Sequence, residues 1–307
     1  MEHWDVVIIG AGPAGLCAGV YCGRAKLKTL VLDKLAPGGA LLVTDLVEDY
    51  PGFDRISGAE LAERMEAQAR KFGAEFRLAE VKHIALNGGK KIITTDEGTL
   101  TSDVVIITSG STPHRLGVPG ETGFLGKGVS TCALCDGAFF QNEVIAVVGG
   151  GDSALKEAIF LTKYASKIYL IHRRDQFRAQ KTWQDKVVAH PKVELVLDSV
   201  VDEILGETTV TGVAVRNVRS GEVRQLAVTG VFVFVGSQPN TFFAREHLEH
   251  DASGYLVTNA DMETAVPGIY VAGDVRSQLT RQISNAVGDA TVASVAAEHY
   301  LEHLRGH

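Results

Sequence analysis

Residues 5–15 read DVVIIGAGPAG, and this pattern indicates the architecture of the chain. It joins an apolar run to three glycines, and small residues follow as far as Ala25, a pattern typical of a strand, a tight turn and a helix. In such turns the first glycine bends the chain, the second lets backbone N–H groups approach a pyrophosphate, and the third packs helix against strand. A further apolar run over 29–32 ends in Asp33, at the distance where an acid binds ribose hydroxyls. The stretch therefore predicts a bound dinucleotide, with its phosphates at the helix N-terminus.

A second copy of this pattern, VIAVVGGGDSA, occupies residues 144–154. The next apolar run, 167–171, is followed by His-Arg-Arg at 172–174 and by Arg178. A site for NAD normally presents a carboxylate there, whereas guanidinium groups suit the 2′-phosphate of NADPH. We therefore expect NADPH at the second turn. We expect FAD at the first turn, where Asp33 stands and no positive charge is present to select a 2′-phosphate. A solvated basic face is the alternative reading of the arginines.

Length and composition agree with a folded protein that binds small molecules. The chain has 307 residues, enough for two domains, and 45% of them are hydrophobic. The formal net charge of −7 argues against a nucleic-acid partner, because phosphate binding needs a basic surface. The first residues enter an apolar strand without the basic and long apolar regions of a signal peptide, and no run is long enough to span a membrane. We expect a cytoplasmic protein.

The four cysteines fall into two pairs of different character. Cys17 and Cys22 lie in the expected first helix, and we interpret both as small core residues. Cys132 and Cys135 form a CxxC motif without a second ligand pair at zinc spacing, so redox chemistry is favoured over a metal site. A disulfide can close there in a tight turn at the start of a helix, whose N–H groups stabilise a thiolate. Asp136, beside the thiols, is either a helix N-terminal carboxylate or a proton donor to a leaving thiolate.

A third turn, GIYVAGD at 268–274, precedes a long run of small and apolar residues that predicts a helix over 283–304. We expect this helix to pack on the first nucleotide unit, so that the second unit is an insertion. The expected fold is α/β, with two Rossmann-like, three-layer ββα dinucleotide-binding domains, the second inserted into the first. The FAD domain would comprise 1–113 and 241–307, and the NADPH domain with the CxxC would comprise 114–240. Gly/Pro turns mark both crossings between them.

In their order along the chain these motifs resemble those of the low-molecular-weight thioredoxin reductases of bacteria and archaea, over essentially the whole length. The resemblance implies a homodimeric enzyme that passes electrons from NADPH through FAD to the dithiol, and then to the disulfide of thioredoxin. It further implies that Cys135 faces the flavin, that Cys132 attacks the partner disulfide and that Asp136 is the acid. One domain would rotate against the other between the two half-reactions.

The resemblance also implies a set of cofactor residues, with Asp274 on the ribityl chain. FAD would be bound by Gly10, Gly12, Pro13, Ala14, Gly15, Asp33, Lys34, Gly38, Gly39, Ala40, Asp49, Val81, Thr108, Gly110, Gly273, Asp274, Arg281, Gln282 and Ile283. NADPH would be bound by Gly149, Gly151, Asp152, Ser153, Ala154, His172, Arg173, Arg174 and Arg178, and no metal is expected. The chain departs from the family pattern at Ala40 (usually Gln), Asp49 (usually Asn) and Lys156 (usually Glu). The first two departures change hydrogen bonding and charge near the flavin.

Three other functions fit parts of this pattern. The chain could serve a different dithiol carrier, such as a glutaredoxin-like protein, and the surface around the CxxC would decide this. It could be a nucleotide-binding redox sensor, in which the dithiol switches shape or partners. A flavin oxidase is the third, although that chemistry does not require the CxxC.

Overall fold

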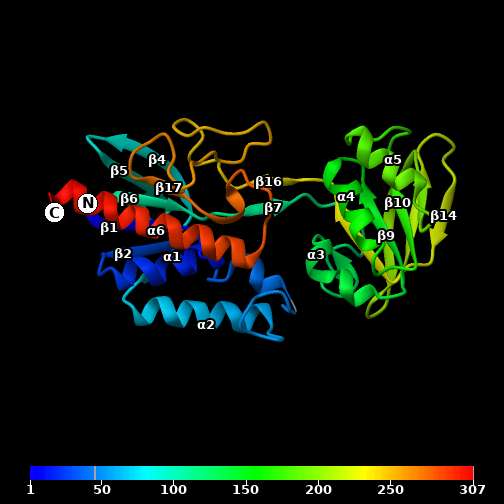
Figure 1. Ribbon diagram of the computed structural model, residues 1–307, viewed down its shortest axis with the longest axis horizontal. Coiled ribbons are helices and arrows are strands. Elements are labelled where there is room, and N and C mark those ends of the chain that lie inside the picture. Colours follow the sequence, from blue (N-terminus) through cyan, green and yellow to red (C-terminus); the bar gives the residue numbers. More distant parts are fainter. Residues whose placement is uncertain (45, 307) are drawn as a thin grey trace. The chain divides into compact units, whose positions relative to one another are not determined.

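The computed structural model describes residues 1–44 and 46–306 (Figure 1). The chain forms two compact units, here called unit 1 (residues 1–112 and 238–307) and unit 2 (residues 113–237). Unit 2 is therefore inserted into unit 1. The domain boundaries predicted from the sequence lie after residues 113 and 240, and the limits of the two cofactor domains remain a prediction.

A seven-stranded sheet forms the centre of unit 1, in the order β3-β2-β1-β6-β5-β4, with β17 also paired to β6. Strands β1, β2, β3, β6 and β17 run parallel, whereas β5 is antiparallel to both β4 and β6. The strands are β1 (Glu2–Ile9), β2 (Thr29–Asp33), β3 (Glu75–Leu78), β4 (Val81–Asn87), β5 (Lys90–Thr95), β6 (Gly98–Ile107) and β17 (Ile269–Val271). The helical segments are α1 (Pro13–Arg24), η1 (Gly39–Val43), α2 (Gly58–Lys71), η3 (Gly273–Val275) and α6 (Ile283–Arg305).

The apolar run of β1 is buried on both faces of the sheet, which explains why it shows no alternation of polar and apolar residues. One face packs against α1 and α6, which lie together on the same side (Figure 1). Their contact uses small residues such as Cys17, Ala290 and Ala293, which let the two helices approach closely. Cys17 and Cys22 are both buried, as predicted, and burial raises the pKa of the Cys22 thiol to about 12. These two thiols are core residues.

Unit 2 is built on a five-stranded parallel sheet in the order β11-β10-β9-β15-β8 and a three-stranded antiparallel sheet, β12-β13-β14. The strands are β8 (Val129–Ser130), β9 (Val144–Gly149), β10 (Lys167–Ile171), β11 (Val193–Val196), β12 (Ser199–Gly206), β13 (Val210–Asn217), β14 (Val223–Leu226) and β15 (Gly230–Phe234). The helical segments are α3 (Ala133–Asp136), η2 (Gly137–Phe140), α4 (Asp152–Leu161) and α5 (Lys181–Ala189). Separate apolar clusters lie on the two faces of the parallel sheet.

The two crossings of the chain pair with each other as short strands, β7 (Ser111–Pro113) and β16 (Ser237–Pro239). Parallel strands, glycine turns and an inserted second unit confirm the predicted α/β fold. None of the helices within 1–44 and 46–306 combines the length and the apolar character needed to cross a membrane.

Candidate active site

The first glycine turn joins β1 to α1. Its three glycines differ in whether the surrounding backbone leaves room for a side chain. Gly10 has a φ of +109°, and a Cβ there would lie 2.4 Å from the carbonyl oxygen of Thr108. A Cβ on Gly15 would lie 1.8 Å from the oxygen of Gly10. A Cβ on Gly12 would meet only the Cα of Gly39, at 4.0 Å. The fold itself therefore requires glycine at 10 and 15, but not at 12.

Backbone groups around this turn are held by Asp33 at the end of β2. Its Oδ2 accepts a hydrogen bond from the Ala11 amide at 2.6 Å, and its Oδ1 accepts one from the Leu35 amide at 3.0 Å. α1 begins at Pro13 with Gly12 as its N-cap, so its first amides have no capping side chain at that position. Asp33 thus lies beside the open end of α1, and its role toward a ribose remains a prediction.

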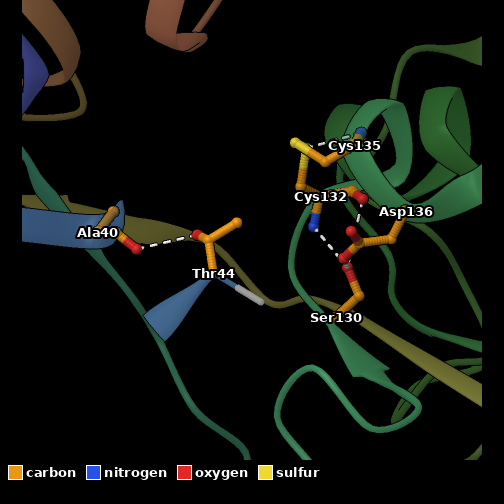
Figure 2. The surroundings of a disulfide bond; sticks show 6 residues. All are labelled: Ala40, Thr44, Ser130, Cys132, Cys135 and Asp136. Atoms are coloured by element: carbon orange, nitrogen blue, oxygen red, sulfur yellow. Dashed lines mark hydrogen bonds between the residues drawn. A yellow bond between two sulfur atoms is a disulfide. The ribbon is translucent and has the colours of Figure 1, made fainter. Parts of the chain in front are cut away.

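The turn at Gly38 and Gly39 packs directly on the first turn. The Gly38 amide donates to the Ala11 carbonyl at 2.7 Å, and a Cβ on Gly39 would lie 3.0 Å from the Cα of Gly12. The Ala40 carbonyl accepts a hydrogen bond from the Thr44 hydroxyl at 2.9 Å (Figure 2). Asp49 is exposed. The first two contacts unite two motifs that lie apart in the sequence.

A cavity of about 80 Å³ in unit 1 opens beside the first turn and the end of β2. Four residues selected from the sequence line it: Gly10, Asp33, Lys34 and Val81. The other lining residues were not predicted from the sequence: Ile9, Leu32, Ala79, Glu80, Ser109, Asn240, Phe242 and Phe243. The one sequence signal for the last pair is two consecutive aromatic residues shortly after the Gly/Pro turn at 236–240.

The third turn places Asp274 in η3, next to the beginning of α6. Burial raises the pKa of the Asp274 carboxyl to about 6, against the opposing effect of Arg281, while Asp289 adds to the rise. The Arg281 guanidinium lies 3.9 Å from the centre of the Tyr255 ring, and its Nε donates to the Asp274 carbonyl at 3.4 Å. Gln282 is the N-cap of α6, which begins at Ile283.

A partly buried ion pair that was not predicted from the sequence, Asp289 with Arg276, holds this third turn. Asp289, on α6, accepts bonds from the Arg276 guanidinium at 3.0 and 3.1 Å and from the Gly273 amide at 3.1 Å. Its side chain is 8% exposed. An acid within the part of the helix that is otherwise rich in small and apolar residues was the available signal. The pair fixes Gly273, the residue before Asp274, against α6.

In unit 2 the second glycine turn joins β9 to α4. A Cβ on Gly149 would lie 2.4 Å from the Phe234 carbonyl oxygen, and a Cβ on Gly150 would lie 2.1 Å from the His172 ring. A Cβ on Gly151, the N-cap of α4, would meet nothing within 4 Å. Asp152 accepts a hydrogen bond from the Gln180 amide at 2.9 Å. Gly151 in this turn thus corresponds to Gly12 in the first.

The structure separates His172 from the arginines that follow it. His172 is buried against Gly150 and stacks on Phe177. Burial lowers the pKa of its imidazole and neighbouring guanidinium groups lower it further, although a hydrogen bond to the Gln176 carbonyl opposes them. Arg173, Arg174 and Arg178 are exposed, and the ion pairs found among the described residues of unit 2 do not include them. Positive charge beyond β10 therefore comes from the arginines and not from His172.

Cys132 and Cys135 form a disulfide (Figure 2), as the CxxC motif predicts. Their Cα atoms are 5.4 Å apart, and both residues are partly buried. Cys132 is the N-cap of α3, and the Cys135 amide donates to the Cys132 sulfur at 3.1 Å. α3 has only four residues before the chain tightens into η2, so it is shorter than the expected helix. This amide would also donate to a thiolate at Cys132.

Asp136 is held by Ser130, which the sequence analysis did not select. The Ser130 hydroxyl donates to Asp136 Oδ2 at 2.5 Å, and its oxygen accepts a bond from the Cys132 amide at 3.0 Å (Figure 2). Ser130 is buried at the end of β8. One hydroxyl therefore ties the acid to the backbone of the first cysteine. A serine two residues before the motif was the only signal in the sequence.

These features define a class of protein: two glycine turns that each open a helix, in separate units, together with a two-cysteine disulfide. The sequence model of the pyridine nucleotide-disulphide oxidoreductase family matches residues 4–290. The thioredoxin reductase of Listeria monocytogenes is 43% identical over 303 residues, which cover 98% of this chain and 95% of the relative. The thioredoxin reductase of Treponema pallidum is 42% identical, with 98% of each chain covered.

A solved structure supports the same assignment. The thioredoxin reductase of Streptococcus pyogenes superposes with a TM-score of 0.96 at 44% identity, covering 98% of this chain and 99% of that one. The chain belongs to the pyridine nucleotide-disulphide oxidoreductase family and, within it, to the thioredoxin reductases. The family predicted from the motifs is therefore confirmed, and the disulfide fits the redox-active CxxC of such an enzyme.

Proposed function

We propose that the protein transfers electrons from NADPH through FAD to the Cys132–Cys135 disulfide, and from the resulting dithiol to oxidised thioredoxin. The observation that carries this proposal is the disulfide itself, with its acid and serine neighbours, in a chain that has two nucleotide-type glycine turns. Thioredoxin as the partner, a homodimer as the assembly and the cytoplasm as the location are part of the proposal.

The residues of unit 1 fit FAD. Gly12 leaves open space at the N-terminus of α1, where backbone amides favour a pyrophosphate. Asp33 lies beside this end of the helix and lines the cavity, in the position of an acid that binds ribose hydroxyls. The Gly273 amide, directly before Asp274, is held against α6 by the Asp289 carboxylate, which also pairs with Arg276. The other residues predicted for FAD come from the family resemblance alone.

The residues of unit 2 fit NADPH. Gly151 leaves space at the N-terminus of α4 as Gly12 does at α1. Arg173, Arg174 and Arg178 offer exposed guanidinium groups after β10, where a 2′-phosphate is recognised in this type of fold. His172 is better interpreted as a support for the turn, because its ring packs beneath Gly150.

When bound, FAD supplies two-electron transfer between the nicotinamide and a disulfide. Two electrons and two protons open the bond between Cys132 and Cys135 to a dithiol. The Cys132 thiol loses its proton, and the thiolate attacks one sulfur of the thioredoxin disulfide and displaces the other, which Asp136 protonates. The Cys135 thiol then loses its proton and attacks the Cys132 sulfur in the mixed disulfide. The bond from Cys132 to thioredoxin breaks, the departing thioredoxin sulfur takes up the second proton, and the disulfide of the enzyme is restored. Ser130 positions Asp136 for this proton transfer.

The first experiment is anaerobic NADPH oxidation by the FAD-loaded protein, with and without oxidised thioredoxin. We expect many turnovers only with thioredoxin. Cys132→Ser should keep flavin reduction by NADPH, because that step does not use the dithiol, and should lose thioredoxin turnover, because the attacking thiol is gone. Flavin reduction that stops after stoichiometric NADPH with every thioredoxin would point to another acceptor, and retained turnover in Cys132→Ser would assign the attack to another thiol.

A further inference from the structure

We propose that His83, Glu246 and His247 form a binding site in unit 1 for a divalent transition-metal ion of the zinc type. The three side chains each offer one ligand atom, and these atoms lie within 4.8 Å of one another. His83 Nε2 is 3.8 Å from Glu246 Oε2, and the two histidine rings lie edge to face with centroids 6.4 Å apart. His83 and Glu246 are separated by more than half of the chain, so no sequence motif announces this cluster.

The backbone holds the two halves of the cluster together. The Ile84 amide, next to His83 on β4, donates to the Phe243 carbonyl at 3.1 Å. Phe243 and Leu248 are buried on either side of Glu246 and His247, which anchors the segment that carries them. The site is therefore built on a sheet strand and on a segment fixed to that strand.

An irregularity in β4 points His83 outward. The pairing of β4 with β5 shifts register between Val81 and His83, and both Lys82 and His83 are exposed between the buried Val81 and Ile84. A regular strand would alternate and would turn one of these two side chains toward the core. The bulge thus makes the imidazole available on the surface.

Two imidazoles and a carboxylate are ligands that suit zinc and its neighbours, whereas magnesium and calcium prefer oxygen ligands alone. Ligand atoms about 2.1 Å from a tetrahedral ion are roughly 3.4 Å apart, so ligand atoms that are now up to 4.8 Å apart must approach by at most about 1.4 Å. All three side chains are exposed and can make this adjustment by rotation. Three protein ligands leave a coordination position for water, so we expect an exchangeable ion and not a permanent structural one.

The ion would bridge β4 to the segment that carries Phe242 and Phe243. Both aromatic residues line the cavity of unit 1, as does Val81 of β4. Metal binding should therefore stiffen this wall of the cavity. The proposed function implies that the cavity holds part of FAD. On that basis, the bound ion should slow the release of FAD.

The test is a calorimetric titration of zinc ion into tag-free, FAD-loaded protein with the disulfide closed, so that free CxxC thiols do not bind zinc. We expect one zinc per chain with a dissociation constant below about 100 μM. His83→Gln and His247→Gln should each weaken binding at least about tenfold, because each removes one of three ligands. His299→Gln, an exposed histidine on α6, is the matched control and should bind as the wild type does.

Absence of zinc binding by the wild type would overturn the site, and so would binding by His83→Gln and His247→Gln that is as tight as that of the wild type. The same titration in Cys132→Ser/Cys135→Ser must give the same zinc affinity, and loss of binding there would assign the metal to the CxxC. A second readout is FAD release after dilution, with and without zinc. Zinc that binds at His83 without slowing release would overturn the link to the cavity while leaving the site and the proposed electron transfer intact.

Discussion

At Asp274 the fold changes the protonation of a single residue in a way that can be measured. Its carboxyl is partly buried in η3, and this burial raises its pKa from 3.8 to about 6, although Arg281 opposes the shift. The folded protein therefore keeps a proton at pH values where the unfolded chain has lost it. The stabilisation that Asp274 contributes in this way is complete below about pH 4 and is lost as the pH rises toward 6.

Asp274→Asn should remove this part of the pH dependence of stability. Between about pH 4 and pH 7, the free energy of unfolding of the wild type should fall relative to that of the variant by about 2–3 kcal/mol. Urea unfolding of the flavin-free protein at both pH values measures the difference. Asp261→Asn, at an exposed position, should keep the slope of the wild type, and a wild-type slope in Asp274→Asn would refute the assignment.

Arg173 tests the nucleotide preference of unit 2. Its exposed guanidinium, like those of Arg174 and Arg178, has no carboxylate partner among the described ion pairs of that unit. Arg173→Ala should raise the KM for NADPH by about tenfold and change the KM for NADH little, because only NADPH carries the 2′-phosphate. Steady-state kinetics with NADPH and with NADH measure both KM values. Arg224→Ala on β14 is the surface control. Equal effects on both nucleotides would support the solvated basic face.

Among the elements, the glycine turns separate what the fold needs from what a ligand needs. A Cβ added at Gly10, Gly15 or Gly149 would clash with a backbone carbonyl of the same unit, so packing requires glycine at these positions. Gly12 and Gly151 stand at the N-termini of α1 and α4 with open space before them. The same motif thus contains two kinds of glycine, and pattern alone does not distinguish them.

Gly15→Ala and Gly12→Ala should therefore behave differently. The alanine Cβ at 15 would lie 1.8 Å from the Gly10 oxygen, so unit 1 should lose more than about 3 kcal/mol of stability or fail to fold. At position 12 the backbone φ is −73° and the nearest atom is 4.0 Å away, so flavin-free stability should change by less than about 1 kcal/mol. FAD content after purification should nevertheless fall. Full FAD binding by Gly12→Ala would contradict the proposed position of the pyrophosphate.

Across the whole molecule, the insertion of unit 2 means that the chain leaves and re-enters unit 1 at one place. Asn240 joins the two crossings on the side of unit 1. Its side-chain amide donates to the Ser109 carbonyl at 2.8 Å, its backbone amide donates to the Gly110 carbonyl at 3.0 Å, and its side-chain oxygen accepts a bond from the Thr112 hydroxyl at 3.1 Å. The Ser109 hydroxyl donates to the Asn240 carbonyl at 2.7 Å. The rotation implied by the family resemblance remains a prediction, and any such motion would start from these fixed ends.

Asn240→Ala should loosen the crossings. It removes two side-chain hydrogen bonds and leaves the Ser109 carbonyl without this donor, which should cost about 1–3 kcal/mol of stability. Thermal unfolding measures the loss, and Thr112→Val, which removes only the weaker exposed bond, should cost less than about 1 kcal/mol. Equal stability of Asn240→Ala and the wild type would show that the backbone pairing of β7 and β16 holds the crossings by itself.

The sequence by itself was enough for the two glycine turns, the disulfide, the α6 helix and the insertion of the second unit. Each of these depends on the backbone geometry of a short segment or on the order of such segments, and local sequence specifies that geometry. The tertiary structure alone decided that His172 supports Gly150, that Asp289 holds the Gly273 turn and that Ser130 reaches Asp136. It also placed Phe242 and Phe243 at the cavity, and His83 beside Glu246 and His247. These contacts depend on side-chain rotamers and on segments that meet only after the sheet has formed. The spacing of residues along the chain therefore does not predict them.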